Sequence, residues 1–496
     1  MVTASRAPDA ATHGRVRGSS SASSQSGAPL ERRTKILATL GPATDAPGVL
    51  DALVAAGLDC ARLNCSHGTS AELLRRAIDV RAAAARAGRP LGLLFDLQGP
   101  KLRLTADTVE RAVVPGDVIV LTGSEHAAAS DRAVVDFEAF SSLVTERSEI
   151  VIGDGVPRLA VQRTDNGDVV ARAVFGGALG PRKGVSVTYA RPDLPTITPK
   201  DVADLAHAAR MDADFVALSF VRTGADLKEL RDRLRAHGSR AGVVAKIETV
   251  EAYDNLDEII EAADGILIAR GDYGVTAGLA SVPVMQKDTI RRAKAAGKLV
   301  ITATQMLESM ITNAEPTRAE VADVANAVID GTSALMLSAE TSVGVHPVAA
   351  VDAMSVIADA AEQMLDGGPE RRTFHAGPPA AVMHAAVQLA DDVGAAAIVL
   401  PTATGRAARA CARYRPRQPI IALTNDHVVA RQLTLEWGVY PVVADLPESL
   451  DQLVCAALRV GCDFAGLGSG DRVVVTAGKR AGAQGPTDVI VERTLP

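Results

Sequence analysis

Eight short apolar runs, separated by helical patterns, constrain the fold of this chain more than any other feature. Most are uninterrupted aliphatic stretches, which is typical of parallel strands buried on both faces. The runs are Lys35–Leu40, Ala61–Asn64, Leu91–Leu97, Phe215–Phe220, Val243–Ile247, Ile266–Ala269, Leu299–Ala303 and Ala334–Leu337. The helical patterns include Asp45–Ala56, Ser70–Ala87, Pro199–Arg210, Val282–Ala296 and Thr317–Ile329. This alternation predicts an α/β fold with a (β/α)8 TIM barrel over residues 31–103 and 187–366.

The interval between the third and fourth runs is too long for a single helix. It contains alternating apolar and polar residues, together with turn signals such as Pro115–Asp117 and Gly153–Gly155. We therefore expect a small all-β domain, inserted into the barrel over residues 104–186.

A Gly- and Pro-bearing stretch near residues 367–379 marks a further boundary. Five more apolar runs follow it, at Ala396–Leu400, Pro419–Leu423, Val439–Val443, Arg472–Thr476 and Asp488–Val491. They predict a C-terminal α/β domain with a mostly parallel sheet over residues 367–496. Residues 1–30 are rich in Ser, Ala, Gly and Arg, which favours a disordered tail over the alternative of an organellar transit peptide.

Composition excludes several classes of protein. The net charge of −7 and a single Trp argue against a general nucleic-acid binder. No apolar run reaches the roughly 18 residues of a membrane helix. The five cysteines are odd in number and form no CxxC pair, which predicts reduced thiols in a cytoplasmic protein. Only 3% of residues are aromatic, so the core must consist of small aliphatic side chains, as in a barrel interior.

Polar side chains follow six of the eight runs, where the catalytic groups of such barrels collect. Glu248 and Asp272 follow neighbouring strands and could offer oxygens to one Mg²⁺ or Mn²⁺ ion. Lys246 shares the strand end of Glu248, and the cations Arg62 and Arg103 belong to two other strand ends. Cations and a metal, without a Ser-His-Asp set, suit phosphoryl transfer, in which spread charge is matched electrostatically.

Two further strand ends suit a small carboxylate. The Gly271–Asp272 backbone could bind one if it opens a helix, and Thr304 offers a hydroxyl on the adjacent strand. A purely structural interpretation stays open. In it, Glu248 and Asp272 pair with Lys246 and Arg270, and Thr304 bonds to the backbone.

The strand-end strings resemble the pyruvate kinase family, in order and over most of the chain. They are RLNCSHG at residues 62–68, DLQGPKLR at 96–103, RKGV at 182–185, FVALSFVR at 215–222, KIE at 246–248, ARGD at 269–272, ATQMLESM at 303–310 and PTRAEVADVANAV at 316–328. The resemblance implies a barrel, an inserted β domain acting as a lid, and a C-terminal α/β domain. It also implies transfer of the phosphoryl group of phosphoenolpyruvate to ADP in glycolysis, and usually a homotetramer.

The resemblance also assigns roles to individual residues. Glu248 and Asp272 would hold the divalent metal, and Lys246 would stabilise the transferring phosphoryl group. Gly271, Asp272 and Thr304 would hold the substrate carboxylate, with Thr304 on the path of the proton. Arg62 would contact phosphate. The residues implied to bind the nucleotide are Arg103, Lys183, Asn64 and His67.

The chain departs from the family where many members bind K⁺. The matching positions are Asn64, Ser66, Asp96 and Leu97, but Leu97 has no side-chain oxygen to donate. Lys101 stands where K⁺-dependent members carry Glu, and its ammonium group could replace the charge of the ion. We therefore expect activity without K⁺.

Three other departures bear on turnover. The family usually has Glu at Thr276, Gly at Ala339, and Asn-Leu-Pro-Gly in place of residues 186–189. Because of these changes, the interpretation of the chain as a degenerate, regulatory paralogue stays open. A second alternative is a lyase or aldolase of the phosphoenolpyruvate/pyruvate type, which also places Mg²⁺ on a Glu and an Asp.

A loop in the C-terminal domain follows a predicted strand and opens a helix. In the family this loop, here Thr402, Thr404, Gly405 and Arg406, belongs to a site for phosphorylated allosteric effectors. An ordinary Gly-bearing turn explains the same residues, and both interpretations stay open.

Overall fold

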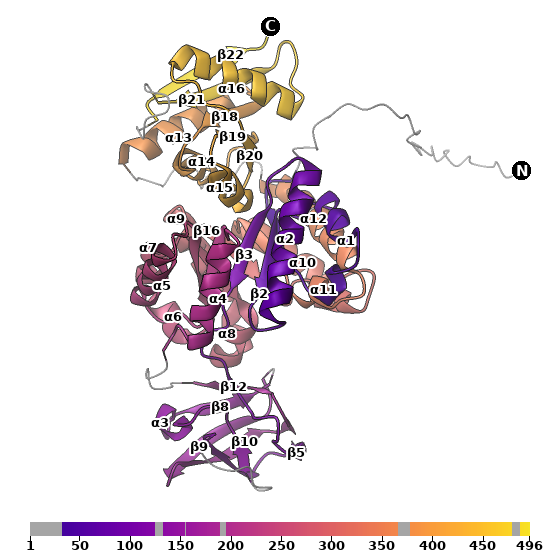
Figure 1. Cartoon of the computed structure of the whole chain (residues 1–496), viewed down its shortest axis with the longest axis vertical. Helices are drawn as coiled ribbons and strands as arrows, with labels where there is room; N and C mark the ends of the chain where they lie inside the picture. Colours follow the sequence, from indigo (N-terminus) through magenta and orange to yellow (C-terminus); the bar gives the residue numbers. More distant parts are fainter. Residues whose placement is uncertain (1–31, 125–131, 154, 189–194, 366–376, 479–486) are drawn as a thin grey trace, which may run out of the picture.

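The computed structural model describes residues 32–124, 132–153, 155–188, 195–365, 377–478 and 487–496. In this part of the chain three lobes lie in a row, with the barrel between the inserted β domain and the C-terminal domain (Figure 1). The N-terminal tail predicted over residues 1–30 lies outside the described residues, as does most of the predicted boundary near 367–379.

The eight predicted strands form one closed parallel barrel, in the order β1-β17-β16-β15-β14-β13-β3-β2. Their bounds are β1 Lys35–Thr39, β2 Cys60–Asn64, β3 Gly92–Asp96, β13 Phe215–Leu218, β14 Gly242–Ile247, β15 Gly265–Ala269, β16 Leu299–Ala303 and β17 Ala334–Leu337. β13 ends two residues earlier than predicted, because Phe220 takes a left-handed φ of 54° that breaks the ladder. The predicted TIM barrel is confirmed.

Alternating side chains of the strands build two cores. Leu94, Leu267 and Ile301 pack with one another inside the barrel. Ile36 and Leu93, on the other face of their strands, pack against the surrounding helices. Small aliphatic side chains thus fill the interior, as the scarcity of aromatic residues predicts.

Capping residues decide where several barrel helices begin. Thr69, Thr198 and Thr317 each form a capping box with an acidic residue three positions on. The predicted start of the first helix at Asp45 is wrong. The helix begins at Val49, because Gly48 takes a left-handed φ of 84° that a helix cannot include. The main barrel helices are α1 Val49–Ala55, α2 Ser70–Ala87, α4 Pro199–Arg210, α5 Gly224–Ala236, α7 Leu256–Ala262, α9 Val282–Ala295, α10 Arg318–Asp330 and α12 Pro347–Glu362.

The inserted domain is built mainly on a seven-stranded sheet of order β4-β12-β8-β9-β10-β6-β7, with a two-stranded sheet β11-β5 beside it. The strands are β4 Leu102–Arg103, β5 Arg111–Val113, β6 Val118–Thr122, β7 Arg132–Val134, β8 Glu149–Ile152, β9 Arg158–Asp165, β10 Asp168–Phe175, β11 Gly177–Leu179 and β12 Gly184–Val187. A one-turn helix, α3 Phe140–Leu143, interrupts them. The antiparallel pair β4 and β12 carries the chain out of the barrel and back.

The C-terminal domain has the predicted, mostly parallel sheet, in the order β20-β19-β18-β21-β22, with only β22 antiparallel. Its strands are β18 Ala397–Pro401, β19 Ile420–Thr424, β20 Val439–Val443, β21 Arg472–Ala477 and β22 Val489–Thr494. The helices packed on this sheet are α13 Gly377–Asp392, α14 Arg406–Ala412, α15 His427–Gln432 and α16 Leu450–Ala465.

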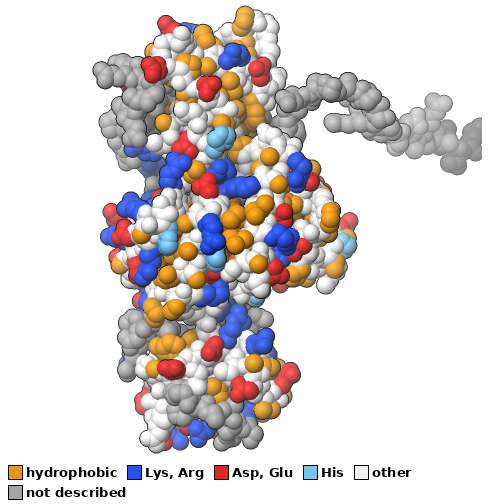
Figure 2. Space-filling model, viewed as in Figure 1, with side chains coloured by type: hydrophobic (Ala, Val, Ile, Leu, Met, Phe, Trp, Pro, Cys, Tyr) orange, Lys and Arg blue, Asp and Glu red, His pale blue; other side chains and the backbone are white. Residues whose placement is uncertain are grey.

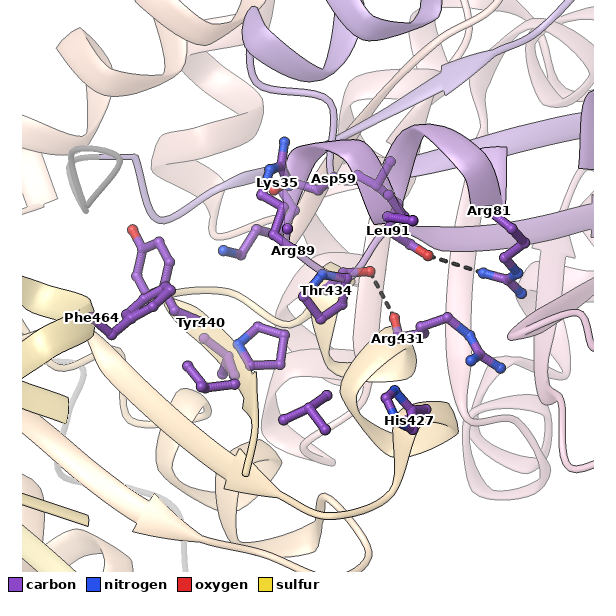
Figure 3. A pocket seen from close by; sticks show the side chains of 18 residues that line it. Lys35, Asp59, Arg81, Arg89, Leu91, His427, Arg431, Thr434, Tyr440 and Phe464 are labelled. Atoms are coloured by element: carbon purple, nitrogen blue, oxygen red, sulfur yellow. Dashed lines mark hydrogen bonds between the residues drawn. The ribbon is translucent and has the colours of Figure 1, made fainter. Parts of the chain in front are cut away.

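A cavity of about 540 Å³ lies between the C-terminal domain and the amino ends of the barrel strands (Figure 3). Lys35 and Leu91, at the amino ends of β1 and β3, line it from the barrel. Tyr440 and His427 line it from the C-terminal domain. The cavity is therefore at the opposite end of the barrel from the predicted catalytic residues.

The surface of the described residues carries both signs of charge. Acidic and basic side chains are interspersed over the face shown in Figure 2. None of the described helices is long and apolar enough to cross a membrane.

Candidate active site

Charged side chains from three strands meet at the carboxyl end of the barrel. Lys246, at the end of β14, places its Nζ 2.9 Å from Glu248 Oε1 and 3.3 Å from Asp96 Oδ1. Asp96, at the end of β3, also accepts a 2.7 Å hydrogen bond from Arg62 Nε. All four side chains are nearly buried. The structure thus joins four of the predicted site residues in one cluster of ion pairs and hydrogen bonds.

Two hydroxyl groups complete the cluster, and neither was singled out from the sequence. Ser219 Oγ accepts from Lys246 Nζ at 2.6 Å and donates to the Leu97 carbonyl at 2.7 Å. Thr39 Oγ1 accepts from Arg62 Nη1 at 2.8 Å. Both residues lie at the carboxyl ends of barrel strands, as the charged residues do. Their place in the sequence could therefore have predicted them in the same way.

The cluster holds opposite charges that stabilise one another. Burial alone would raise the pKa of Asp96, but Lys246 and Arg62 outweigh it and hold that pKa below its ordinary value. Burial would lower the pKa of Lys246, and Asp96 and Glu248 more than reverse this, so its pKa is raised. Lys246 is therefore a fixed positive charge at neutral pH.

Glu248 and Asp272 have the chemistry of a divalent-metal site. Burial raises the pKa of Glu248, Lys246 lowers it and the nearby Asp272 charge raises it again, with a net rise. A hard cation bound between the two carboxylates would stabilise the charged form of Glu248. Among the described residues no cluster of three or more His, Cys, Asp or Glu forms a complete cage. An ion here would take its other oxygens from substrate and water, as Mg²⁺ commonly does.

Helix α8, Arg270–Ala277, opens directly after β15, as the predicted carboxylate site requires. The Gly271 amide donates to Thr304 Oγ1 at 2.9 Å, and that hydroxyl donates to the Ala303 carbonyl at 2.7 Å. The helix N-terminus and the Thr304 hydroxyl are therefore neighbours, at the site where we expect a carboxylate.

The structural alternative is half right. Glu248 pairs with Lys246, and Thr304 bonds to backbone, as that interpretation requires. Its pairing of Asp272 with Arg270 is wrong, because Arg270 points away and binds Asp323 at 2.7 Å. Asp272 is left 38% exposed, with Lys101 Nζ 4.0 Å away.

Two of the positions that match the family's K⁺ site make hydrogen bonds through their backbone amides. Asn64 Oδ1 accepts from the Ser66 amide at 3.0 Å. Leu97 is buried, and its amide donates to the Ala217 carbonyl. Lys101 is the added cation on this side of the site, held near Asp272 rather than in the buried cluster.

Gly99, between Leu97 and Lys101, needs to be glycine. Its φ is 66°, and an added Cβ would lie 2.9 Å from Ser219 Cβ. Its amide donates to Asp201 Oδ1 at 3.2 Å. The tight turn at Gly99 thus lies against Ser219, the residue that binds Lys246.

Arg103 and Lys183 lie on or beside the two strands that link the barrel to the inserted domain. Arg103 ends β4, and its Nη1 donates to the Arg182 carbonyl at 3.1 Å. Lys183, just before β12, donates to the Ala178 carbonyl at 2.6 Å. His67 lies close to Arg103 and Lys101: burial and the charges of these two residues lower its pKa. Arg103 and Lys183 thus belong to the segments that join the barrel to the inserted domain, and His67 lies near Arg103.

The structure describes both single-residue departures from the family, and Thr276 lies beside the cluster, with its Oγ1 3.4 Å from the Glu248 carbonyl. Thr276 Oγ1 donates to the Tyr273 carbonyl at 3.0 Å, so its hydroxyl is occupied within α8. Ala339 begins the short helix α11 Ala339–Ser342, and the neighbouring Glu340 is buried, accepting from the Leu307 and Ser338 amides. Of the altered segment at 186–189, Ser186 pairs with Val151, while residue 189 lies outside the described residues.

The predicted effector loop is closed on itself. Gly405, at φ 76°, donates its amide to Thr402 Oγ1 at 3.0 Å. Arg406 Nε donates to Thr404 Oγ1 at 3.2 Å, and the helix that follows has only seven residues. The geometry fits the ordinary turn as well as it fits a phosphate loop.

A (β/α)8 barrel with a buried Lys–Asp–Glu–Arg cluster at its carboxyl end is typical of the class of enzymes that act on anionic substrates. Comparison with known proteins narrows this class. The model of the pyruvate kinase barrel domain matches residues 31–351, and that of the pyruvate kinase alpha/beta domain matches residues 380–491.

Curated relatives agree with the domain matches. Pyruvate kinase of Geobacillus stearothermophilus is 41% identical over 479 residues, covering 93% of this chain and 80% of the relative. Pyruvate kinase 2 of Synechocystis is 40% identical, covering 93% and 79%. Pyruvate kinase of Methylorubrum extorquens is 39% identical, covering 92% and 96%. The chain belongs to the pyruvate kinase family and is a phosphotransferase by that membership.

Proposed function

We propose that this protein transfers the phosphoryl group of phosphoenolpyruvate to ADP, forming pyruvate and ATP in cytoplasmic glycolysis. The observation that carries the proposal is the Lys246 ammonium, held charged between Asp96 and Glu248 at the barrel's carboxyl end. A fixed cation at this place matches the charge that a transferring phosphoryl group spreads over its oxygens.

The residues divide the substrate among them. Lys246 and Arg62 face the phosphoryl group. The Asp272 amide at the start of α8 and the Thr304 hydroxyl face the carboxylate, which would displace the present bonds from Gly271 and to Ala303. Arg103, Lys183, His67 and Asn64 face the nucleotide from the lid side.

Glu248 and Asp272 would hold Mg²⁺ or Mn²⁺. When bound, the ion supplies positive charge to the phosphoryl oxygens and to the enolate oxygen that forms as the phosphoryl group leaves. Thr304 then lies on the path of the proton that converts the enolate to pyruvate. Closure of the inserted domain would exclude water, so that ADP rather than water receives the phosphoryl group.

We also propose that K⁺ is not required. The ammonium of Lys101 lies 4.0 Å from Asp272 and adds one positive charge beside the site. The oxygen-free side chain of Leu97 supports the same conclusion. A homotetramer and a phosphorylated effector at Thr402–Arg406 complete the proposal, on family likeness alone.

A steady-state assay of the purified chain with phosphoenolpyruvate, ADP and Mg²⁺ tests the reaction. We expect pyruvate and ATP to form in equal amounts, with activity lost in a chelator and restored by Mg²⁺. Tight phosphoenolpyruvate binding without turnover would instead establish a binding paralogue. Pyruvate formed without ATP would establish a lyase.

A further inference from the structure

The turn after β16 holds Thr304 in an unfavourable backbone conformation. Thr304 has φ 68° and Gln305 has φ 53°, so two consecutive residues with side chains take left-handed conformations. A β-branched residue such as Thr rarely does so, because its side chain crowds the backbone. The surrounding structure must therefore hold this turn in place.

Arg270, the first residue of α8, binds the turn from the neighbouring strand end. Its Nη2 donates to the Thr304 carbonyl at 2.7 Å and to the Gln305 carbonyl at 3.2 Å. Its Nε donates to the Ala303 and Thr304 carbonyls, both at 3.2 Å. One buried guanidinium group thus binds three consecutive carbonyls of the turn.

Asp323, on α10, fixes the remaining edge of the guanidinium group. Arg270 Nη1 donates to both Asp323 oxygens, at 2.8 and 2.7 Å, and lies 3.3 Å from Gln286 Oε1 on α9. A planar fork held in this way has one orientation, which a lysine ammonium could not reproduce. The Gly271 amide, next in the chain, bonds the Thr304 hydroxyl itself.

We propose that Arg270 and Asp323 form a positioning clamp, which holds the Thr304 hydroxyl at the N-terminus of α8. Arg270 acts through the backbone of the turn and Asp323 acts through Arg270, so they are positioning residues and not catalytic ones. The inference rests on the proposed function, because it assigns the clamp to the residue on the carboxylate and proton side of that reaction.

The first test is independent of activity. Hydrogen exchange of a peptide covering residues 301–310 is compared in wild type, Arg270→Lys and Arg76→Lys. Arg76 is a matched control, since it is also a buried barrel arginine that binds both oxygens of one carboxylate, Asp45. We expect exchange at least tenfold faster in Arg270→Lys alone, and unchanged exchange would overturn the clamp.

The second test follows the proton. In D₂O the proposed site should exchange the methyl protons of pyruvate, and we expect Arg270→Lys to reduce this exchange and kcat at least tenfold. The KM for ADP should stay within twofold of wild type. Arg76→Lys should leave all three quantities within twofold.

A mutant cycle separates positioning from a general loss of structure. In a Thr304→Ala background, Arg270→Lys should reduce kcat by less than threefold, because the group that the clamp positions is already absent. Equal losses in both backgrounds would overturn the proposal. Asp323→Asn should show the same pattern at smaller size, and it serves as the test if Arg270→Lys does not fold.

Failure of the clamp and failure of the proposed function give different results. A wild type that forms no ATP contradicts the function, while the hydrogen-exchange comparison still decides the clamp. A wild type that forms ATP, with Arg270→Lys equal to Arg76→Lys, contradicts the clamp alone.

Discussion

At the carboxyl ends of the barrel strands, buried Lys246 lies between two carboxylates, whereas at the amino ends buried Lys35 lies 4.2 Å over the ring of Tyr440. The pKa of Lys246 is raised by its partners. Burial lowers the pKa of Lys35 to about 8, although Asp59 partly opposes it. The carboxyl end of the barrel therefore stabilises the charged form of its buried lysine, whereas the amino end destabilises the charged form of Lys35.

The ion pairs at the amino ends serve a different purpose from those at the carboxyl ends. Asp214, just before β13, binds Arg81 of the barrel and Arg431 of the C-terminal domain, at 3.0 and 2.7 Å. Arg240 and Asp426 form a second link between the same two domains. We infer that charge at the amino ends mainly joins domains, while charge at the carboxyl ends serves chemistry.

The largest expected effect breaks the carboxyl-end cluster. Lys246→Met should reduce kcat by about 10²–10³ or more, as for other groups that stabilise charge in a transition state. The exposed Lys228→Met, on α5, is the control and should retain full activity. A Lys246→Met variant with more than a tenth of wild-type kcat would show that the cluster is not catalytic.

The next effect breaks the amino-end link. Asp214→Asn removes a fully buried charge from two arginines and should lower the free energy of unfolding by about 3 kcal/mol. Because the link is remote from the site, kcat should change less than twofold. Urea titration measures this loss of stability. As a control, Asp232→Asn breaks an exposed ion pair with Arg235 and should lower the free energy of unfolding by no more than about 0.5 kcal/mol. Equal midpoints for the two variants would contradict the assignment.

A smaller effect sharpens the contrast between the two lysines. The pKa of Lys35 is about 8 in the folded chain and 10.5 when unfolded, so the unfolded chain binds more protons between these values. Stability at this residue should therefore rise with pH, by about 1–2 kcal/mol between pH 7.5 and 9.5 relative to Lys35→Met. If the free energy of unfolding changes with pH in the same way for the two proteins, the pKa of Lys35 is not lowered in the folded chain.

The smallest expected effect is the response to K⁺. With Lys101 supplying a charge beside Asp272, activity in K⁺-free buffer should equal activity with K⁺ within about twofold. Tetramethylammonium replaces K⁺ at constant ionic strength in this assay. Activity below a few per cent of the K⁺ rate would contradict the role of Lys101.

Much of the barrel and its site could be predicted from the sequence, because buried parallel strands are continuous apolar runs. The residues at their ends, such as Glu248 and Asp272, could be read in order along the chain. Family likeness supplied their roles, which spacing alone left open.

Contacts between distant residues could not be predicted in this way. Arg270 and Asp323 lie 53 positions apart on a strand end and a helix, and the sequence offered only the nearer Asp272 as a possible partner of Arg270. The left-handed φ values of Phe220 and Thr304 were also missed, since neither residue type indicates a turn. Tertiary contacts impose these conformations, at about 1–3 kcal/mol each.

The most direct test of the account is ³¹P NMR of wild-type protein with phosphoenolpyruvate, ADP and Mg²⁺. The carboxyl-end cluster should convert the phosphoenolpyruvate signal into the γ-phosphate signal of ATP, with little inorganic phosphate, and Lys246→Met should leave the spectrum nearly unchanged over the same time. Release of inorganic phosphate, or an unchanged spectrum with wild type, would contradict the claim that this end of the barrel transfers a phosphoryl group to ADP.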